Sequence, residues 1–402
     1  MGNSEKKNLG RAYVIEFVMF FTYAFFAVNW IAGSTLTPQI MEHFELKTFA
    51  SATFISNAIT VAKIIGNFMA AGILVKLYPK KAIGLGSGCI VLGSMIAIFA
   101  PAYWLFILGR FAMGFGGALY VVYFSPVVIH YFDPARRPAV NALNGVAYNF
   151  GSILAMVVVG PVIAWLETWQ YSMGFFAAVS AVLWCLWPIV GQDFELNKSA
   201  GTEQAPYTIW QALKEKNNLL LPFTYSGLLT FYLVILNIFP ISGTTVISSK
   251  MLSVLVAVGG IAGSLLAILL AKIYTKRLPV IRLSGIGITG FGFLMLWTDN
   301  GVLSSLAAFL IGVFMFLPGS SLMMIPQEFE GMTPAKLTTI MGLFWALSYI
   351  IETAVYFIIG FVIDFFGYGM GLNLALLMSV TVFAGSFLLP ETGEKKIIFM
   401  LH

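Results

Sequence analysis

Long apolar segments alternate with short polar ones along almost the whole chain. Each apolar segment holds about 20 residues or more, the length that one helix needs to cross a bilayer. The pattern predicts helices because a bilayer leaves unpaired backbone groups unsatisfied, and the alternation typical of a membrane β-barrel is absent. The segments lie at about 12–34, 49–75, 82–101, 103–129, 138–165, 169–190, 217–240, 247–272, 279–298, 302–325, 335–363 and 370–389. We therefore expect an all-α membrane protein with twelve transmembrane helices.

The longest polar stretch separates six apolar segments from six others. It divides the chain into an N-terminal six-helix bundle at 1–190, a cytoplasmic linker at 191–216 and a C-terminal six-helix bundle at 217–402. The end of this stretch, from Thr208 to Lys216, can form a short amphipathic helix with Trp210 on its apolar side. Such a helix would rest on the inner membrane surface. A plain solvated linker is the alternative.

A short segment recurs in the two halves. The segment after the second apolar run, 74–81 (LVKLYPKK), is similar to the segment after the eighth, 270–277 (LAKIYTKR). The two fall at the same point of each six-helix half. We therefore interpret the two bundles as pseudo-symmetric products of a duplication.

Composition and charge exclude most other classes of protein. Hydrophobic residues make up 59% of the chain and charged residues 10%, whereas soluble proteins carry about 25% charged residues. The net charge of +5 does not indicate a nucleic-acid partner, because the basic residues lie in short loops and form no continuous patch. The surroundings that this composition predicts are membrane lipids.

The basic residues orient the predicted spans. With the N-terminus inside, 18 of the 22 Lys and Arg residues fall in inner segments, Lys47 and Lys250 fall outside, and Lys63 and Arg110 lie within spans. This bias predicts a multi-pass protein of the cell inner membrane with both termini cytoplasmic. The first apolar run is too long for the core of a signal peptide, so we interpret it as a retained helix.

Three charged residues stand in the interior of predicted spans. Arg110 lies in the fourth span, Lys63 near the middle of the second and Glu352 beyond the middle of the eleventh. A charge at mid-bilayer costs at least ~2.5–3.5 kcal/mol on insertion scales, so each is a candidate functional residue. The alternative is a buried ion pair that only fixes helix packing. Glu16, about one turn inside the first span, is interpreted as an interfacial residue.

Polar side chains recur on several spans. Asn144 and Tyr148 are four residues apart in the fifth span and share a face, and Asn149 follows them. Tyr120 lies in the fourth span and Tyr225 in the seventh. Such groups either bind a small molecule or hold helices together, and the sequence leaves both readings open.

The sequence gives no sign of an enzyme. Its three histidines lie far apart, and it contains no Gly-rich phosphate loop, Cys-x-x-Cys pair or nucleophile motif. We therefore expect no catalytic residue, no cofactor and no metal. A polytopic membrane enzyme is the less favoured alternative, since it would need a cluster of catalytic groups near a membrane face.

Several motifs mark the spans and loops. The most specific is 109–118 (GRFAMGFGGA), in which Arg110 precedes a face of small residues. Others are the loop 131–139 (YFDPARRPA), Gly151, Gly160 and Pro161, the stretch 169–175 (WQYSMGF), Gly360, Asp364 and Gly367, and the ending Pro390, Glu391 and Thr392. Over nearly the whole chain these motifs resemble the major facilitator superfamily of secondary transporters. One departure is that Lys76 and Pro79 stand where this family carries Asp and Gly, so the inner charge network must differ.

The resemblance implies two six-helix bundles around a central cavity and alternating access. It implies a monomeric secondary active transporter for a small-molecule solute, by symport or antiport, with protons or a counter-ion as coupling partner. Two buried cations against one well-buried anion favour an organic anion, a carboxylate or an amino acid as the solute. A lipid or glycolipid flippase and a drug efflux pump of the same fold are the alternatives.

The positions of Lys63 and Glu352 suggest a pair. Lys63 lies 13 residues above Lys76, at a height of roughly 20 Å, and Glu352 lies 16 residues above Lys336, at roughly 24 Å. The resemblance implies that helices 2 and 11 are neighbours. We therefore expect these opposite charges to approach each other across the two halves.

Overall fold

The computed structural model describes residues 2–46, 49–196, 198–199, 202–203 and 207–393, and these are almost entirely α-helical. Within these ranges the one sheet is an antiparallel pair of two-residue strands, β1 (Lys198–Ser199) and β2 (Thr202–Glu203). The predicted all-α membrane fold is confirmed. Three basic residues used to orient the chain, Lys47, Lys395 and Lys396, lie outside the described residues.

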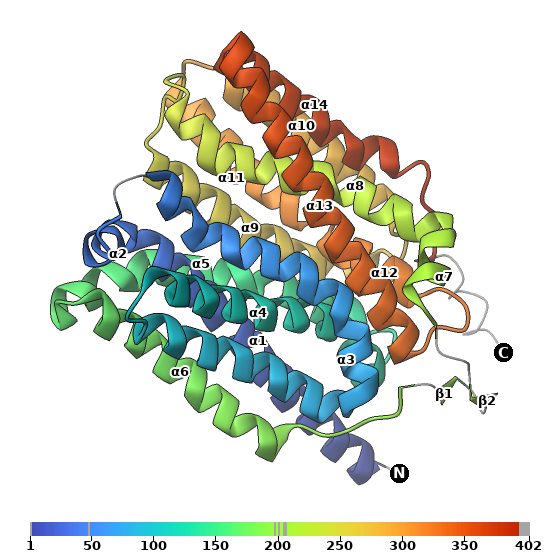
Figure 1. Ribbon diagram of the computed structural model, residues 1–402. Coiled ribbons are helices and arrows are strands. Elements are labelled where there is room, and N and C mark those ends of the chain that lie inside the picture. The colour runs from blue at the N-terminus through green and yellow to red at the C-terminus, as the bar shows by residue number, and fades with distance from the viewer. Residues whose placement is uncertain (1, 47–48, 197, 200–201, 204–206, 394–402) are drawn as a thin grey trace. The chain divides into compact units, whose positions relative to one another are not determined.

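The helices follow the predicted apolar segments in order (Figure 1). The first half holds α1 (Gly2–Thr35), α2 (Thr37–His43), α3 (Phe49–Ile98), α4 (Tyr103–Tyr131), α5 (Arg137–Leu166) and α6 (Trp169–Val190). The second half holds α7 (Ile209–Lys214), α8 (Lys216–Leu233), α9 (Ser249–Ile273), α10 (Leu278–Trp297), α11 (Gly301–Phe316), α12 (Gly319–Gln327), α13 (Pro334–Phe366) and α14 (Tyr368–Gly385). A π-helical turn at Val234–Ile238 extends α8, and α11 and α12 together form one span.

Helix α3 is two membrane spans joined at a kink. Its 50 residues would extend about 75 Å if straight, more than twice the thickness of the hydrocarbon core. The backbone leaves the helix at Tyr78, where φ is 62° and ψ is 161°, immediately before Pro79. Proline has no N–H to donate and disfavours helix in the residue before it, so the chain turns back there (Figure 1). The 11 long apolar helices among the described residues therefore supply twelve spans.

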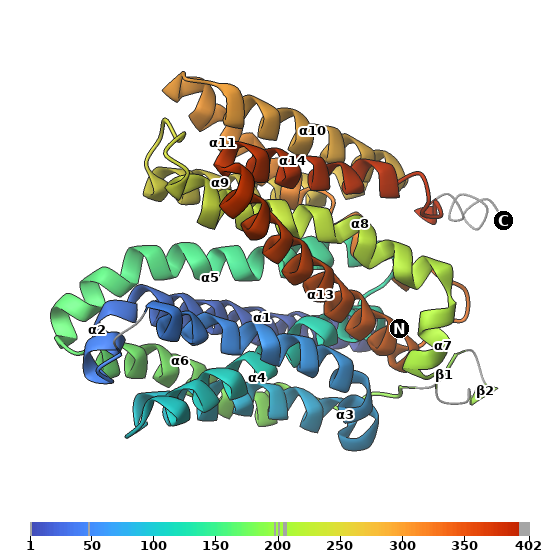
Figure 2. The same ribbon diagram turned by 45° about the horizontal axis from the view of Figure 1, so that its top comes forward.

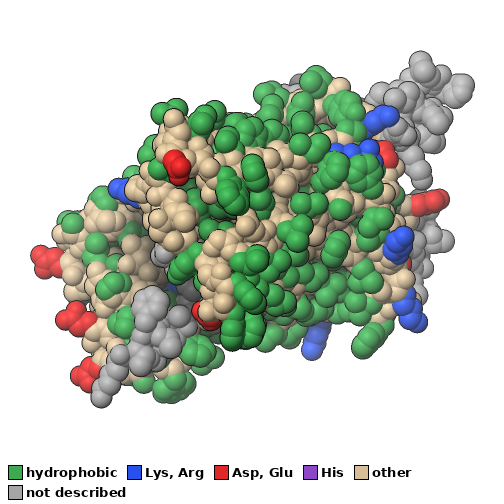
Figure 3. Space-filling view, turned by 90° about the horizontal axis from the view of Figure 1, so that it is seen from above, with side chains coloured by type: hydrophobic (Ala, Val, Ile, Leu, Met, Phe, Trp, Pro, Cys, Tyr) green, Lys and Arg blue, Asp and Glu red, His purple; other side chains and the backbone are tan. Residues whose placement is uncertain are grey.

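Large hydrophobic side chains cover much of the surface. Phe99, Ile189 and Phe357 are 72%, 74% and 76% exposed, and many similar residues accompany them along the spans. Figure 3 shows one face on which hydrophobic side chains predominate, while charged side chains lie mainly toward the margins of the view. A soluble monomer rarely exposes such apolar area, whereas lipid tails cover it without cost.

The chain forms two compact units that do not follow the midpoint of the sequence strictly. Unit 1 comprises Met1–Phe132, Ala147–Pro206 and Thr333–Gly342, and unit 2 comprises Asp133–Val146, Tyr207–Met332 and Leu343–His402. Helix α5 therefore begins in unit 2 and ends in unit 1, and α13 does the reverse. These two short segments are where the grouping by contact differs from the linear division expected from the sequence.

The repeated segment marks equivalent helix junctions in the two units. In unit 1 the Asp193 carboxylate accepts a hydrogen bond from the Lys80 N–H at 2.9 Å, where the second arm of α3 begins. In unit 2 the Glu391 carboxylate accepts from the N–H groups of Arg277 and Leu278 at 2.7 and 3.0 Å, where α10 begins. A carboxylate is favourable at a helix N-terminus because the first N–H groups lack helical partners. The shared arrangement supports a duplicated origin.

Candidate functional site

Arg110 is fully buried inside unit 1 and binds backbone carbonyls. From α4, its Nε donates to the Ile55 oxygen of α3 at 3.1 Å, and its Nη1 and Nη2 donate to the Asn29 and Trp30 oxygens of α1 at 3.0 and 2.9 Å. Gly33 leaves room for this group, since a Cβ there would lie 2.5 Å from Nη1. The guanidinium thus ties three helices together. Whether it also meets a solute stays a prediction.

A cluster of three side chains, the Trp30 cluster, joins three helices of the same unit. The Lys63 Nζ of α3 lies 4.7 Å from the centroid of the Trp30 ring of α1. The Tyr148 ring of α5 meets Trp30 edge to face, with centroids 5.8 Å apart. Lys63 is only 3% exposed, and a desolvated cation–π contact contributes about 2 kcal/mol. The cluster presents a cation and two aromatic rings in one place.

Two buried amides extend the polar character of unit 1. Asn149 follows Tyr148 in α5, and Asn67 lies one turn after Lys63 in α3. Both side chains are fully buried, and neither amide has a hydrogen-bond partner within the described ranges. An unsatisfied buried amide costs about 1–3 kcal/mol, so these groups are suited to bind water or a polar solute. Asn67 escaped the sequence analysis, although its spacing from Lys63 places both on one helix face.

Tyr120, the remaining candidate of unit 1, packs against its neighbours, and a role in solute binding stays a prediction. Tyr120 is fully buried beside the Phe124 ring, with centroids 6.5 Å apart, and its ring closes over Gly86 of α3. Glu16, interpreted from the sequence as interfacial, is instead 1% exposed. It shares its helix face with the buried residues Ala12, Met19 and Tyr23, so the protein covers this carboxyl group, and its depth in the membrane stays a prediction.

Unit 2 contains a second pair of Tyr and Trp rings. Tyr225 of α8 meets Trp345 of α13 edge to face, with centroids 5.5 Å apart. In each half the pair therefore joins the first and the fifth span, as Trp30 and Tyr148 do. Glu352, 4% exposed, lies two turns after Trp345 on α13, and its Oε2 accepts a hydrogen bond from the Thr353 hydroxyl at 3.3 Å.

The start of α5 contributes amides to unit 2. Asn141 and Gln327 exchange two hydrogen bonds of 3.2 Å through their side-chain amides. The Ser320 hydroxyl donates to the Pro138 carbonyl at 2.7 Å. Asn144, one turn after Asn141, is half-buried, and its amide has no hydrogen-bond partner in the described part of the chain. Asn141 therefore holds helices together, while Asn144 is suited to bind water or a solute.

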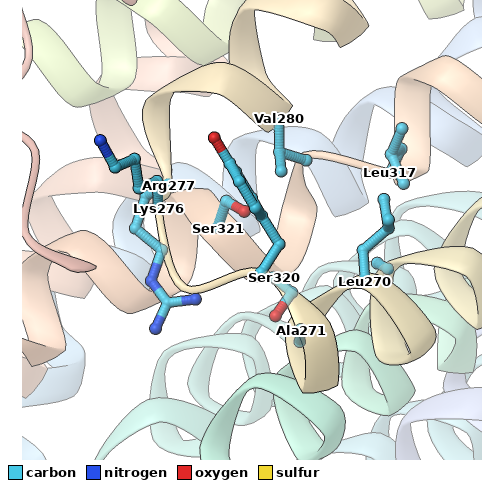
Figure 4. Close-up of a pocket in the computed structure, with 10 residues that line it drawn as sticks. Leu270, Ala271, Lys276, Arg277, Val280, Leu317, Ser320 and Ser321 are labelled. Carbon is cyan, nitrogen blue, oxygen red and sulfur yellow. The ribbon is translucent and has the colours of Figure 1, made fainter. Parts of the chain in front are cut away.

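An ion pair that the sequence analysis did not identify lies at the helix ends of unit 2. Arg277 donates to both carboxylate oxygens of Glu328, at 3.3 and 2.9 Å, and the Thr392 hydroxyl donates to the same carboxylate at 2.7 Å. A small cavity lies beside it, lined by Lys276, Arg277, Ser320 and Ser321 (Figure 4). Its volume of about 10 Å³ is room for one water molecule, so it is too small for an organic solute.

The predicted site residues thus fall into two groups. Arg110, Lys63, Asn149 and Tyr120 belong to unit 1, whereas Asn144, Tyr225 and Glu352 belong to unit 2. Lys63 lies against Trp30, whose carbonyl Arg110 binds, so these two cations are close to one tryptophan. Since Lys63 and Glu352 belong to different units, their pairing stays a prediction.

Known proteins share parts of this sequence. The sequence model of the Major Facilitator Superfamily matches residues 18–351. An uncharacterized protein of Campylobacter jejuni is 32% identical over 180 residues, which are 44% of this chain and 55% of that protein. Inositol transporter 4 of Arabidopsis thaliana is 28% identical over 155 residues, 38% of this chain and 26% of that protein. The matched regions thus span about half or less of these relatives' own length.

Solved structures share the fold. The fucose:proton symporter FucP of E. coli has a TM-score of 0.73 at 17% identity, covering 94% of this chain and 98% of that chain. The proton:xylose symporter XylE has a TM-score of 0.73 at 14% identity, covering 96% and 97%. Identities this low speak for the fold alone. Because the family match extends over most of the spans described above, the chain belongs to the major facilitator superfamily.

Proposed function

We propose that this protein is a monomeric secondary active transporter that moves a small polar solute across the cell inner membrane by alternating access. The observation that carries the proposal is the family match over residues 18–351, in a chain with twelve spans. Buried polar groups in both units supply solute contacts, and the apolar surface accounts for the lipid environment. Family membership also argues against a membrane enzyme.

The solute class that the residues favour is a sugar or cyclitol. Aromatic rings stack on the apolar faces of sugar rings, and amides both donate to and accept from hydroxyl groups. The Trp30 cluster with Asn149 and Asn67 offers both kinds of group in unit 1. The inositol transporters among the relatives agree with this chemistry.

An organic anion, carboxylate or amino acid is the second candidate. The sequence argument for it counted two buried cations, but the Arg110 guanidinium already donates to three carbonyls of its own unit. Of the two cations, Lys63 is the one that still favours an anionic solute, because its ammonium lies against the Trp30 ring of the proposed solute site. Lys63 is therefore the residue whose replacement separates the two classes.

Protons are the coupling ion that we favour. Glu352 is a carboxyl group in a membrane span with 4% exposure, and such groups in transporters serve as proton carriers. Tyr225, Asn144 and Tyr120 would then be helix contacts or secondary solute contacts. The distribution of Lys and Arg supports a cytoplasmic location for both termini, and a reporter fused after His402 that reads periplasmic would contradict this.

The direct test is uptake into proteoliposomes. Purified protein is offered labelled sugars, cyclitols, carboxylates and amino acids, with and without an imposed pH gradient. We expect uptake of one class that the gradient accelerates, and Lys63→Met should abolish uptake of an anion but only slow that of a neutral solute. Translocation of a labelled lipid in place of every soluble solute would overturn the proposal in favour of a flippase.

A further inference from the structure

The most exposed tryptophans follow a pattern with one exception. Among the described residues, four tryptophans are more than 60% exposed: Trp104 (69%), Trp165 (71%), Trp297 (64%) and Trp210 (77%). The first three lie within two residues of the end of a spanning helix, α4, α5 or α10. Tryptophan is enriched at such ends because its ring is apolar and its N–H seeks the headgroup region. Trp210 is equally exposed but lies in α7, outside every span.

Helix α7 is short, but a capping box stabilises its start. The Thr208 hydroxyl accepts from the Gln211 N–H at 3.3 Å, while the Gln211 side chain accepts from the Thr208 N–H at 2.8 Å. This reciprocal pair is a capping box that satisfies donors at the helix start. Trp210 is therefore carried by a capped helix, not by an irregular linker segment, and its side chain has a defined direction.

Asn218 fastens α7 to the base of the next span. Its amide donates to the Tyr207 hydroxyl at 3.2 Å, the Ala212 carbonyl at 3.1 Å and the Glu215 carboxylate at 3.3 Å. Burial, and then the hydrogen-bonded, negatively charged Glu215, raise the pKa of Tyr207, so its hydroxyl stays neutral in this network. Asn218 therefore ties helix α7 to the first turn of α8.

The connection to α8 fixes the distance of α7 from the bilayer. Helix α7 ends at Lys214 and the span of α8 begins at Lys216, with only Glu215 between them. Figures 1 and 2 both show α7 at the end of α8. Six residues of helix measure about 9 Å, so no part of α7 lies far from the membrane boundary.

We propose that α7 lies in the membrane interface, with Trp210 at the boundary of headgroups and acyl chains and Lys214 and Lys216 on the phosphates of anionic lipids. Trp210 and Lys214 are four residues apart and share one helix face, and both lysines are exposed. A lysine stem can lie along apolar surface while its ammonium reaches the phosphates. A lipid surface suits this face better than a protein partner does, because the junction with α8 holds it at the bilayer in any case.

The contact is tested by fluorescence quenching of the full chain in vesicles. The chain is reconstituted in phosphatidylcholine with one-third phosphatidylglycerol, with acyl chains brominated close to the headgroup. The difference between wild type and Trp210→Phe isolates the Trp210 signal, and Trp297→Phe gives the matched control for a tryptophan at a span end. We expect the two difference signals to be quenched to a similar extent. A Trp210 signal that bromine leaves intact and aqueous iodide quenches would overturn the proposal.

The role of lipid charge is tested separately. In Lys214→Gln with Lys216→Gln, the gain in Trp210 quenching on adding phosphatidylglycerol should fall by at least half. Lys250→Gln, an exposed lysine at the start of α9, is the control and should keep the full gain. An unchanged gain in the double variant would remove the two lysines from the proposal. None of these readouts depends on transport, so the proposed function can fail independently.

Discussion

The two units hold their buried arginines in opposite ways. In unit 1, Arg110 stands inside a span and donates to three backbone carbonyls. In unit 2, Arg277 stands at a helix end and donates to the Glu328 carboxylate. The charged partner occurs outside the spans, and neutral carbonyl groups serve inside a span. The difference indicates that depth in the membrane, more than the presence of an arginine, decides what satisfies its charge.

What the units share lies elsewhere. The Trp30–Tyr148 and Tyr225–Trp345 contacts join equivalent spans, and Asp193 and Glu391 cap equivalent helix starts. The free N–H groups at a helix start need the same kind of acceptor in both copies of a duplicated bundle. The partners of interior charges differ between the copies, because each charge must suit its own surroundings.

Replacing Arg110 should have the largest effect. Arg110→Lys cannot reproduce a fork of donors to three carbonyls, and each lost bond from a charged donor is worth about 1.5–3 kcal/mol. We expect both Arg110→Lys and Arg110→Ala to lower folded yield by about tenfold or more and to abolish uptake. Folded yield is measured by size-exclusion chromatography in detergent. Gly33→Ala should act in the same direction but less, because it displaces the guanidinium without removing it. Full activity in both Arg110 variants would refute the assignment.

Lys63 and Glu352 give the next largest effect if they pair across the two units. A lone buried charge is the costly species, so Lys63→Met or Glu352→Gln should each destabilise by about 3–5 kcal/mol. The double variant should recover much of that loss. Thermal stability and uptake of the two singles and the double measure the coupling. Additive losses would mean that the two side chains do not meet.

The Arg277–Glu328 pair should show a smaller loss at the helix ends of unit 2. Glu328→Gln leaves a buried guanidinium without its carboxylate, at a cost of about 3 kcal/mol. The control is the exposed pair of Arg136 and Asp133, 3.7 Å apart, where Asp133→Asn should cost about 0–1 kcal/mol. Melting temperatures of the two variants check the contrast, and equal shifts would contradict the role of burial.

Gly145 should affect turnover more than stability. It lies beside the point where α5 passes from unit 2 to unit 1, and a Cβ there would meet nothing within 4 Å. Gly145→Ala should therefore stiffen the helix, raise stability by about 1 kcal/mol or less, and slow uptake several-fold. Gly160→Ala, in the same helix and with equally open space, should leave uptake unchanged. Equal uptake in both variants would exclude a hinge at Gly145.

The sequence predicts the spans well because each helix that crosses the bilayer needs a long run of apolar residues. Even the kink in α3 falls within the predicted loop after residue 75, at Tyr78 and Pro79. The partners of Arg110 cannot be predicted from the sequence, because every residue has a backbone carbonyl and the residue type does not show which carbonyls bind the guanidinium. The Arg277–Glu328 pair escapes prediction because 51 residues separate its two members along the chain. The burial of Glu16 escapes prediction because its position along the sequence does not tell which helix face is covered.

The exchange of segments between the units has a consequence for synthesis. Unit 1 includes Thr333–Gly342, and a Cβ at Gly342 would collide with the Asn67 carbonyl, so α13 packs closely on α3 there. The first unit therefore remains incomplete on the ribosome until Gly342 has emerged. Separate expression of the halves cut in the linker would leave each without a segment of its own unit. Unit 1 can therefore gain its last segment only after the start of the eleventh span has been made.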